Sequence, residues 1–144
     1  MNTVLSSDPE IRELLQSART IAVVGLSART TRPSYGVARY LAEAGYEIIP
    51  VNPHADNWEG IPAFPDLSSI DRKVDLVDVF RRPDFLPATV EDAIQAGVGA
   101  VWTQLGVDNP QATEMCVNAG IPIVINRCTA IEHRRLGVSL ESAL

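Results

Sequence analysis

Lysine is almost absent from this chain, because Lys73 is the only one among 144 residues and the other basic side chains are arginines. The 12 basic and 18 acidic residues give a formal net charge of −6. A protein that binds a nucleic-acid duplex needs a concentrated basic surface, so this balance argues against a nucleic-acid partner. Arginine suits forked contacts with phosphate, although a genome rich in G and C also produces such a bias.

Long apolar runs and cysteine are also scarce. No stretch of 18 apolar residues exists, so we expect no membrane span. The first eight residues are polar and lack the pattern of a signal peptide. The two cysteines, Cys116 and Cys128, do not have the spacing of metal ligands. We therefore expect a cytoplasmic protein with free thiols and no metal site.

Strand and helix signals alternate along the chain, which predicts a parallel sheet with helices on both faces. The fold class is therefore α/β, a Rossmann-like doubly wound sheet in a single three-layer domain over residues 1–144, with its core at about 20–136. The expected strands are Thr20–Leu26, Tyr46–Val51, Val74–Phe80, Ala100–Gln104 and Ile121–Ile125, with a short extension at Ile61–Phe64. The expected helices run from Asp8 to Ala18 with Asp8 as N-cap, Ser34 to Ala44, Pro83 to Gly97, Pro110 to Gly120 and Ala130 to Leu136.

The loop after the first strand is the leading candidate site, because ligands of such sheets bind beyond the carboxyl ends of the strands. Here an apolar run ends at a glycine and leads through a polar, basic loop to a helix start, as at phosphate-binding corners. Ser27 and Ser34 offer hydrogen bonds, while Arg29 and Arg32 offer charge. The candidate residues of this loop are Gly25, Leu26, Ser27, Ala28, Arg29 and Ser34.

Gly25 permits a tight turn and close approach of a phosphate to the backbone. On this interpretation Gly25→Val abolishes ligand binding at a modest cost in stability. The alternative is that Gly25 only closes the turn and that the neighbouring arginines are solvated.

The nicotinamide dinucleotide signature is missing from this loop. The pattern G-x-G-x-x-G would place glycines where the chain has Ser27 and Thr30. The acidic residue expected after the second strand is also missing, since Val51 is followed by Asn52-Pro53-His54. NAD(P) binding is therefore only an alternative reading.

The later loops supply further candidates. Asn52-Pro53-His54 contacts an adenine or ribose, or forms an ordinary turn. Phe80-Arg81-Arg82 places an aromatic ring and two guanidinium groups at a strand end, either as phosphate or purine contacts or as solvated side chains. After the next strand, Gln104 reaches the ligand, whereas Trp102 is expected in the core.

Three more side chains have open roles. Cys128 follows the last strand and is either a reactive thiol or a small buried residue. Cys116 is expected to pack inside a helix, and His133 to lie on the surface or cap a contact. No Ser-His-Asp set, metal cluster or P-loop is visible, so the sequence favours binding over catalysis, and whether the chain is an enzyme stays open.

Together these motifs identify a family. The segments that carry the likeness are Val24-Gly25-Leu26-Ser27, Arg32-Pro33-Ser34-Tyr35, Gly45-Tyr46 through Asn52-Pro53, Val77 through Pro83, Trp102 through Gly106, and Asn126-Arg127-Cys128. Over about Thr20 to Leu136 the chain resembles the small stand-alone CoA-binding proteins. These are similar to the N-terminal, CoA-binding domain of the succinyl-CoA synthetase alpha subunit.

The resemblance implies a Rossmann-like fold that holds coenzyme A (CoA) or an acyl-CoA at the strand ends. It implies that Gly25 to Arg29 bind a phosphate group of CoA and that a further contact lies around Thr103 and Gln104. His54 stands where the synthetase has a lysine, and the synthetase's phosphorylated histidine lies in a domain that this chain does not have. Phosphoryl transfer is therefore not implied.

Two functional hypotheses follow. The first is a non-catalytic CoA-binding protein, in which Cys128 either packs or forms a mixed disulfide with the thiol of CoA. The second is a subunit or small enzyme of acyl-CoA metabolism that needs a partner chain, such as a ligase subunit. Apart from this choice, the chain could also form a homo-oligomer.

Overall fold

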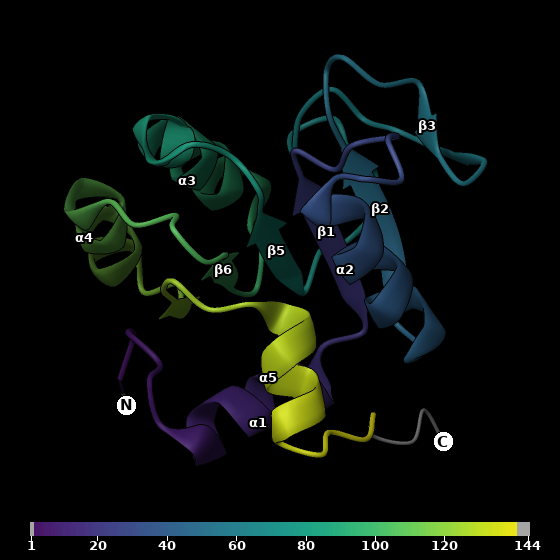
Figure 1. Cartoon of the computed structure of the whole chain (residues 1–144). Coiled ribbons are helices and arrows are strands. Elements are labelled where there is room, and N and C mark those ends of the chain that lie inside the picture. The colour runs from purple at the N-terminus through teal and green to yellow at the C-terminus, as the bar shows by residue number, and fades with distance from the viewer. Residues whose placement is uncertain (1, 141–144) are drawn as a thin grey trace.

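The computed structural model describes residues 2–140 and contains a five-stranded parallel sheet (Figure 1). The strand order is β2-β1-β5-β6-β7. The strands are β1 Thr20–Val24, β2 Glu47–Val51, β5 Leu76–Val79, β6 Val101–Thr103 and β7 Ile123–Val124. A short antiparallel pair, β3 (Asn57–Trp58) and β4 (Ile61–Pro62), lies beside β2. The predicted α/β class and parallel sheet are confirmed.

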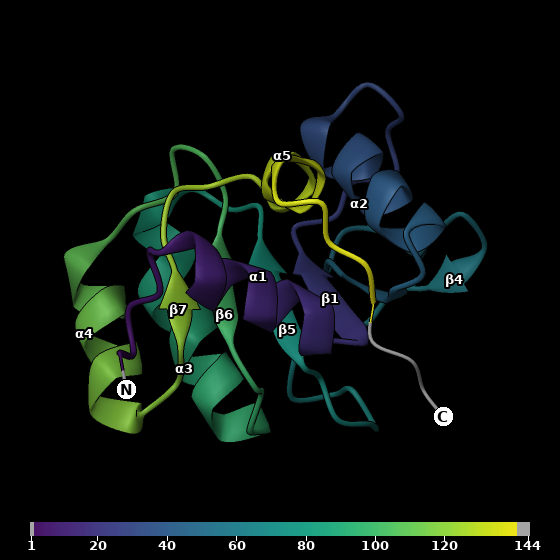
Figure 2. The same ribbon diagram turned by 90° about the horizontal axis from the view of Figure 1, so that it is seen from below.

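Helices cover both faces of the sheet (Figure 2). One face carries α1 (Asp8–Ser17), α2 (Pro33–Glu43) and α5 (Thr129–Arg135). The other carries α3 (Leu86–Ala96), which follows the 3₁₀ turn η1 (Pro83–Phe85), and α4 (Pro110–Ala119). Buried apolar side chains form one cluster on each face, which gives the predicted three layers and the doubly wound arrangement.

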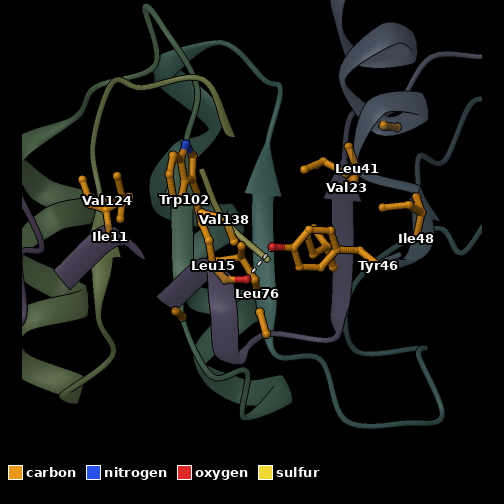
Figure 3. Packing of buried hydrophobic residues seen from close by; sticks show 14 of the residues in the cluster. Ile11, Leu15, Val23, Leu41, Tyr46, Ile48, Leu76, Trp102, Val124 and Val138 are labelled. Carbon is orange, nitrogen blue, oxygen red and sulfur yellow. Dashed lines mark hydrogen bonds between the residues drawn. The ribbon is translucent and has the colours of Figure 1, made fainter. Parts of the chain in front are cut away.

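Two aromatic side chains on the α1 face, Tyr46 and Trp102, are buried among apolar residues (Figure 3), and each has a hydrogen-bond partner for its polar tip. The hydroxyl of Tyr46 donates to the backbone carbonyl of Leu15, which ties α1 to the start of β2. The indole N–H of Trp102 donates to the carbonyl of Arg127 at 2.7 Å. Trp102 is fully buried, so its expected place in the core is confirmed. These bonds remove the penalty of burying an unpaired donor.

The start of α1 differs from the prediction. Ser7 is the N-cap: its hydroxyl accepts from the backbone N–H of Glu10, and the Glu10 carboxylate accepts from the N–H of Ser7. The assignment of Asp8 as the cap is therefore wrong. Asp8 is the first helical residue, and its carboxylate pairs with Arg135 at 2.8 Å, which joins α1 to α5.

His133 is buried rather than on the surface, because α5 packs against α2. Its Nδ1 hydrogen-bonds with the Tyr40 hydroxyl at 2.9 Å, and its ring meets the ring of Tyr46 edge-on at 5.8 Å. Burial lowers the pKa of His133. The surface placement was wrong because sequence periodicity over seven helical residues does not show which helix will lie opposite.

The strand order reverses between β1 and β5, and at this point the backbone is tightly packed. The N–H of Phe80 donates to the carbonyl of Val24 at 2.8 Å. Gly25 has a φ of +85°, and a Cβ built on it would lie 2.4 Å from the carbonyl oxygen of Phe80. Gly25 therefore has a role in the fold itself, and the stability cost of replacing it stays a prediction.

A carboxylate lies in the middle of the sheet. Asp78, on the central strand β5, is 0 % exposed. Its Oδ1 accepts from Nε2 of Gln104 at 2.6 Å, and its Oδ2 accepts from the hydroxyl of Thr129 at 2.8 Å. Burial outweighs these two hydrogen bonds and raises the pKa of Asp78 to about 7.

Replacing Gly25 tests the close packing at the strand reversal. Gly25→Ala should lower the free energy of unfolding by about 1–3 kcal/mol, because of the positive φ and the clash with Phe80. Gly36→Ala is the matched control: Gly36 lies within α2, no atom would contact its Cβ, and alanine should be neutral or stabilising there by about 0.5–1 kcal/mol. Urea denaturation measures both. Equal stability of the two variants would contradict the steric argument.

The buried carboxylate predicts a pH dependence of stability. The pKa of Asp78 is higher in the folded chain, so the folded state holds a proton that the unfolded state releases as the pH rises from about 4 to 7. The free energy of unfolding of the wild type therefore falls as the pH rises through this range. That of the Asp78→Asn variant lacks this fall, because asparagine does not titrate. The difference in unfolding free energy, variant minus wild type, should grow by on the order of 2–4 kcal/mol from about pH 4 to pH 8. Urea denaturation across this range measures it; parallel curves would refute the assignment.

Candidate functional site

Two hollows lie at the carboxyl edge of the sheet and meet at the strand reversal. The larger is a cleft of about 800 Å³, and the smaller measures about 180 Å³. Gly25 and Arg81 line both, so the end of β1 and the end of β5 separate the two spaces. A crevice at this point is where open α/β sheets bind their ligands.

The first loop is held in shape by its serines. The backbone N–H of Ser27 donates to the hydroxyl of Ser34 at 3.0 Å, and the N–H of Arg29 donates to the hydroxyl of Ser27 at 3.1 Å. Helix α2 begins at Pro33 after Arg32, whose side chain does not cap it. The start of α2 therefore faces the larger cleft without a side-chain cap, and such a terminus favours an anion.

Arginines without carboxylate partners gather at this edge. Within residues 2–140, no carboxylate pairs with Arg29, Arg32, Arg81 or Arg82, and three of these four line the hollows. The arginines that do form ion pairs line neither hollow: Arg39, Arg72, Arg127 and Arg135.

The guanidinium groups of Arg81 and Arg82 lie over the ring of Phe85, at 4.7 and 5.7 Å from its centroid. Among the described residues, no aspartate or glutamate lines the larger cleft. The cleft is thus positively charged on the side of β5, which suits a phosphate-bearing ligand.

The second loop shapes the smaller hollow. Asn52 donates from Nδ2 to the carbonyl of Leu26 at 3.0 Å and accepts from the N–H of His54 at 2.8 Å, so its amide joins the first and second loops. Pro53 and His54 are exposed and line the hollow together with Asn52. Asp92, on the far wall, accepts from the N–H of Leu67 at 2.8 Å.

Thr103 and Gln104, at the end of β6, have different surroundings. Thr103 is fully buried, and its hydroxyl accepts from the N–H of Asn126 at 2.8 Å, so its side chain braces the next loop. Gln104 lines the larger cleft, while its amide nitrogen is bonded to Asp78 and Thr129 behind it.

The structure brings most of the predicted site residues together. Those that line the larger cleft are Gly25, Ser27, Ser34, Phe80, Arg81, Arg82 and Gln104. Those that line the smaller hollow are Gly25, Asn52, Pro53, His54 and Arg81. Leu26 is buried, and Leu26, Ala28, Arg29 and Thr103 line neither space. Whether any of them contacts a ligand stays a prediction.

Sequence reasoning left several lining residues out of the site. Val37 of α2, Pro83 of η1 and Leu105–Val107 after β6 line the larger cleft, and Leu105 is 62 % exposed. The signal for Leu105–Val107 was present, because they follow Gln104 in the same loop at a strand end. Val37 gave no such signal, since its spacing is that of an ordinary apolar helix face.

The two cysteines have different surroundings. Cys128 is half-buried and lines the larger cleft, so it is not only a packed core residue. Cys116 is buried within α4, as expected, and burial raises the pKa of its thiol to about 11. A mixed disulfide between Cys128 and CoA stays a prediction.

Within residues 2–140, no three His, Cys, Asp or Glu side chains lie together as metal ligands would, and no helix is long and apolar enough to cross a membrane.

Comparison with known proteins finds relatives that cover most of this chain. The uncharacterized protein YneT of Bacillus subtilis is 40% identical over 127 residues, which are 88% of this chain and 94% of YneT. A solved structure of a hypothetical protein from Pyrococcus horikoshii OT3 is 38% identical, with a TM-score of 0.89 over 91% of this chain and 92% of that one.

A ligase contains a similar segment. The ADP-forming acetate–CoA ligase II of Archaeoglobus fulgidus is 28% identical over 101 residues, which cover 68% of this chain but only 15% of the ligase. The likeness thus concerns one part of a much longer protein.

A family model described as a CoA binding domain matches residues 19–134. This span contains all five strands of the parallel sheet and both hollows. The chain belongs to the CoA-binding domain family.

Proposed function

We propose that this chain binds coenzyme A or an acyl-CoA at the carboxyl edge of its sheet and acts as a binding protein. The observation that carries the proposal is the gathering of arginines without carboxylate partners, Arg32, Arg81 and Arg82, around the larger cleft. Membership of the CoA-binding domain family supports the choice of ligand.

The shape of the site also suits CoA, which has anionic groups between two uncharged ends. Gly25 and Arg81 lie where the two hollows meet, and we place the diphosphate there. The smaller hollow, walled by Pro53 and His54, is of a size for the adenine, and the larger cleft takes the pantetheine arm along Val37 and Leu105. Pockets of such volume and mixed lining are typical of cofactor sites.

A cytoplasmic location remains a prediction.

Titration calorimetry with CoA, dephospho-CoA and NAD tests the proposal. We expect CoA to bind more tightly than NAD, and Arg81→Gln to weaken CoA binding about tenfold, because one charge-assisted hydrogen bond is lost. Arg72→Gln is the matched control, since Arg72 pairs with Glu47 at 2.7 Å and lines neither hollow. Tighter binding of NAD, or equal effects of the two arginine substitutions, would contradict the proposal.

A second candidate function is a CoA-binding subunit that works with a ligase-type partner chain. The observation in its favour is that the similar segment of the Archaeoglobus ligase is only 15% of that protein, which combines it with other parts in one chain. Affinity purification of the tagged chain from its own cells should then recover a grasp-type ligase subunit in equal amount, with acyl-CoA synthesis only in the complex. Recovery of the tagged chain alone would favour the simple binding protein.

A further inference from the structure

The buried carboxylate of Asp78 belongs to a closed network behind the cleft. Its Oδ1 accepts from Nε2 of Gln104 at 2.6 Å, and its Oδ2 accepts from the hydroxyl of Thr129 at 2.8 Å. The same Nε2 also donates to the hydroxyl oxygen of Thr129 at 3.0 Å. Both amide hydrogens of Gln104 are therefore used inside the protein. Gln104 and Thr129 are 5 % and 0 % exposed, so water does not compete for these bonds.

The network determines which way the Gln104 amide is turned. An ionised carboxylate only accepts hydrogen bonds, so it requires the amide nitrogen of Gln104 on its side. In the opposite orientation the amide oxygen would face the carboxylate, with no hydrogen between them. Ionised Asp78 thus permits one of the two orientations and excludes the other.

The carbonyl oxygen of Gln104 is left for a molecule in the cleft. Within residues 2–140, Nε1 of Trp58 is the one fully buried side-chain nitrogen or oxygen that lacks a partner. Oε1 of Gln104 accepts no hydrogen bond from any residue of the described range 2–140 and is not among the fully buried atoms without a partner, so it reaches solvent where Gln104 lines the larger cleft.

We propose that Asp78 and Thr129 are positioning residues: they hold the Gln104 carbonyl oxygen toward the cleft, where it accepts a hydrogen bond from an amide N–H of the pantetheine arm of CoA. This inference rests on the proposed function. It makes the site selective for a ligand that carries an N–H or O–H donor at that place. The Gln104 amide does not need to turn for the bond to form, because the network has already fixed its orientation.

Asp78→Asn tests the positioning role with little change in shape. The neutral amide of asparagine both donates and accepts, so it permits both orientations of Gln104. We expect CoA to bind about 3- to 10-fold more weakly, the effect of one neutral hydrogen bond. The affinity for adenosine 3′,5′-diphosphate, which lacks the pantetheine arm, should not change. Thr129→Val removes one acceptor of the Gln104 amide but keeps the carboxylate, so it should weaken CoA binding less than Asp78→Asn does, again without changing the affinity for adenosine 3′,5′-diphosphate.

The control is Asp75→Asn, the same chemical change at the residue that directly precedes β5. Asp75 accepts from the backbone N–H groups of Arg19 and Thr20 at 2.9 and 3.0 Å and lines neither hollow. Calorimetry at about pH 8, on variants shown to be folded by cooperative urea unfolding, should find its CoA affinity at the wild-type value. The positioning role is overturned if Asp78→Asn weakens both ligands alike or neither, or if Asp75→Asn shows the same difference. Failure of the wild type to bind CoA at all would instead overturn the proposed function.

Discussion

The close approach of Gly25 to the carbonyl of Phe80 is the constraint on which the site depends. It brings the ends of β1 and β5 together at the point where the sheet reverses its strand order. The chain leaves these two strands in different directions, α2 on one face and α3 on the other, so a crevice opens between their loops. Arg81 lines both hollows because it directly follows Phe80, and the Cγ atom of its side chain lies beside Gly25.

The charge distribution follows from this arrangement. Elsewhere, Arg39, Arg72, Arg127 and Arg135 meet carboxylates, and such pairs stabilise the fold only slightly in water. At the carboxyl edge the guanidinium groups of Arg81 and Arg82 rest on the ring of Phe85 instead. An aromatic face holds a cation without neutralising it. The cleft therefore keeps its positive potential despite the net charge of −6 on the whole chain.

Local patterns predicted the sheet and ten of the residues that line the two hollows, because several strands end at a loop that the sequence marks with glycine, proline or paired arginines. Contacts between distant elements were not predictable in this way. The burial of His133 depends on α2, and the partners of Asp78 lie 26 and 51 residues further along the chain. Thr103 is buried like the other two residues of β6, because helices cover both faces of the sheet, and a polar residue at a strand end does not show this in the sequence. Nor does a sequence show that the Cβ of residue 25 would meet another strand.

The position of Asp78 connects the stability of the fold to the chemistry of the site. An apolar residue on β5 would avoid the penalty of desolvating a carboxylate in the central strand, and replacing buried ionic groups by apolar ones often stabilises proteins. Such a replacement would leave both amide hydrogens of Gln104 buried with only one acceptor, Thr129. The amide would then be free to turn over at the cleft surface. A buried acid that weakens the fold yet imposes one orientation on a residue of the cleft is therefore consistent with a role in recognition rather than in folding.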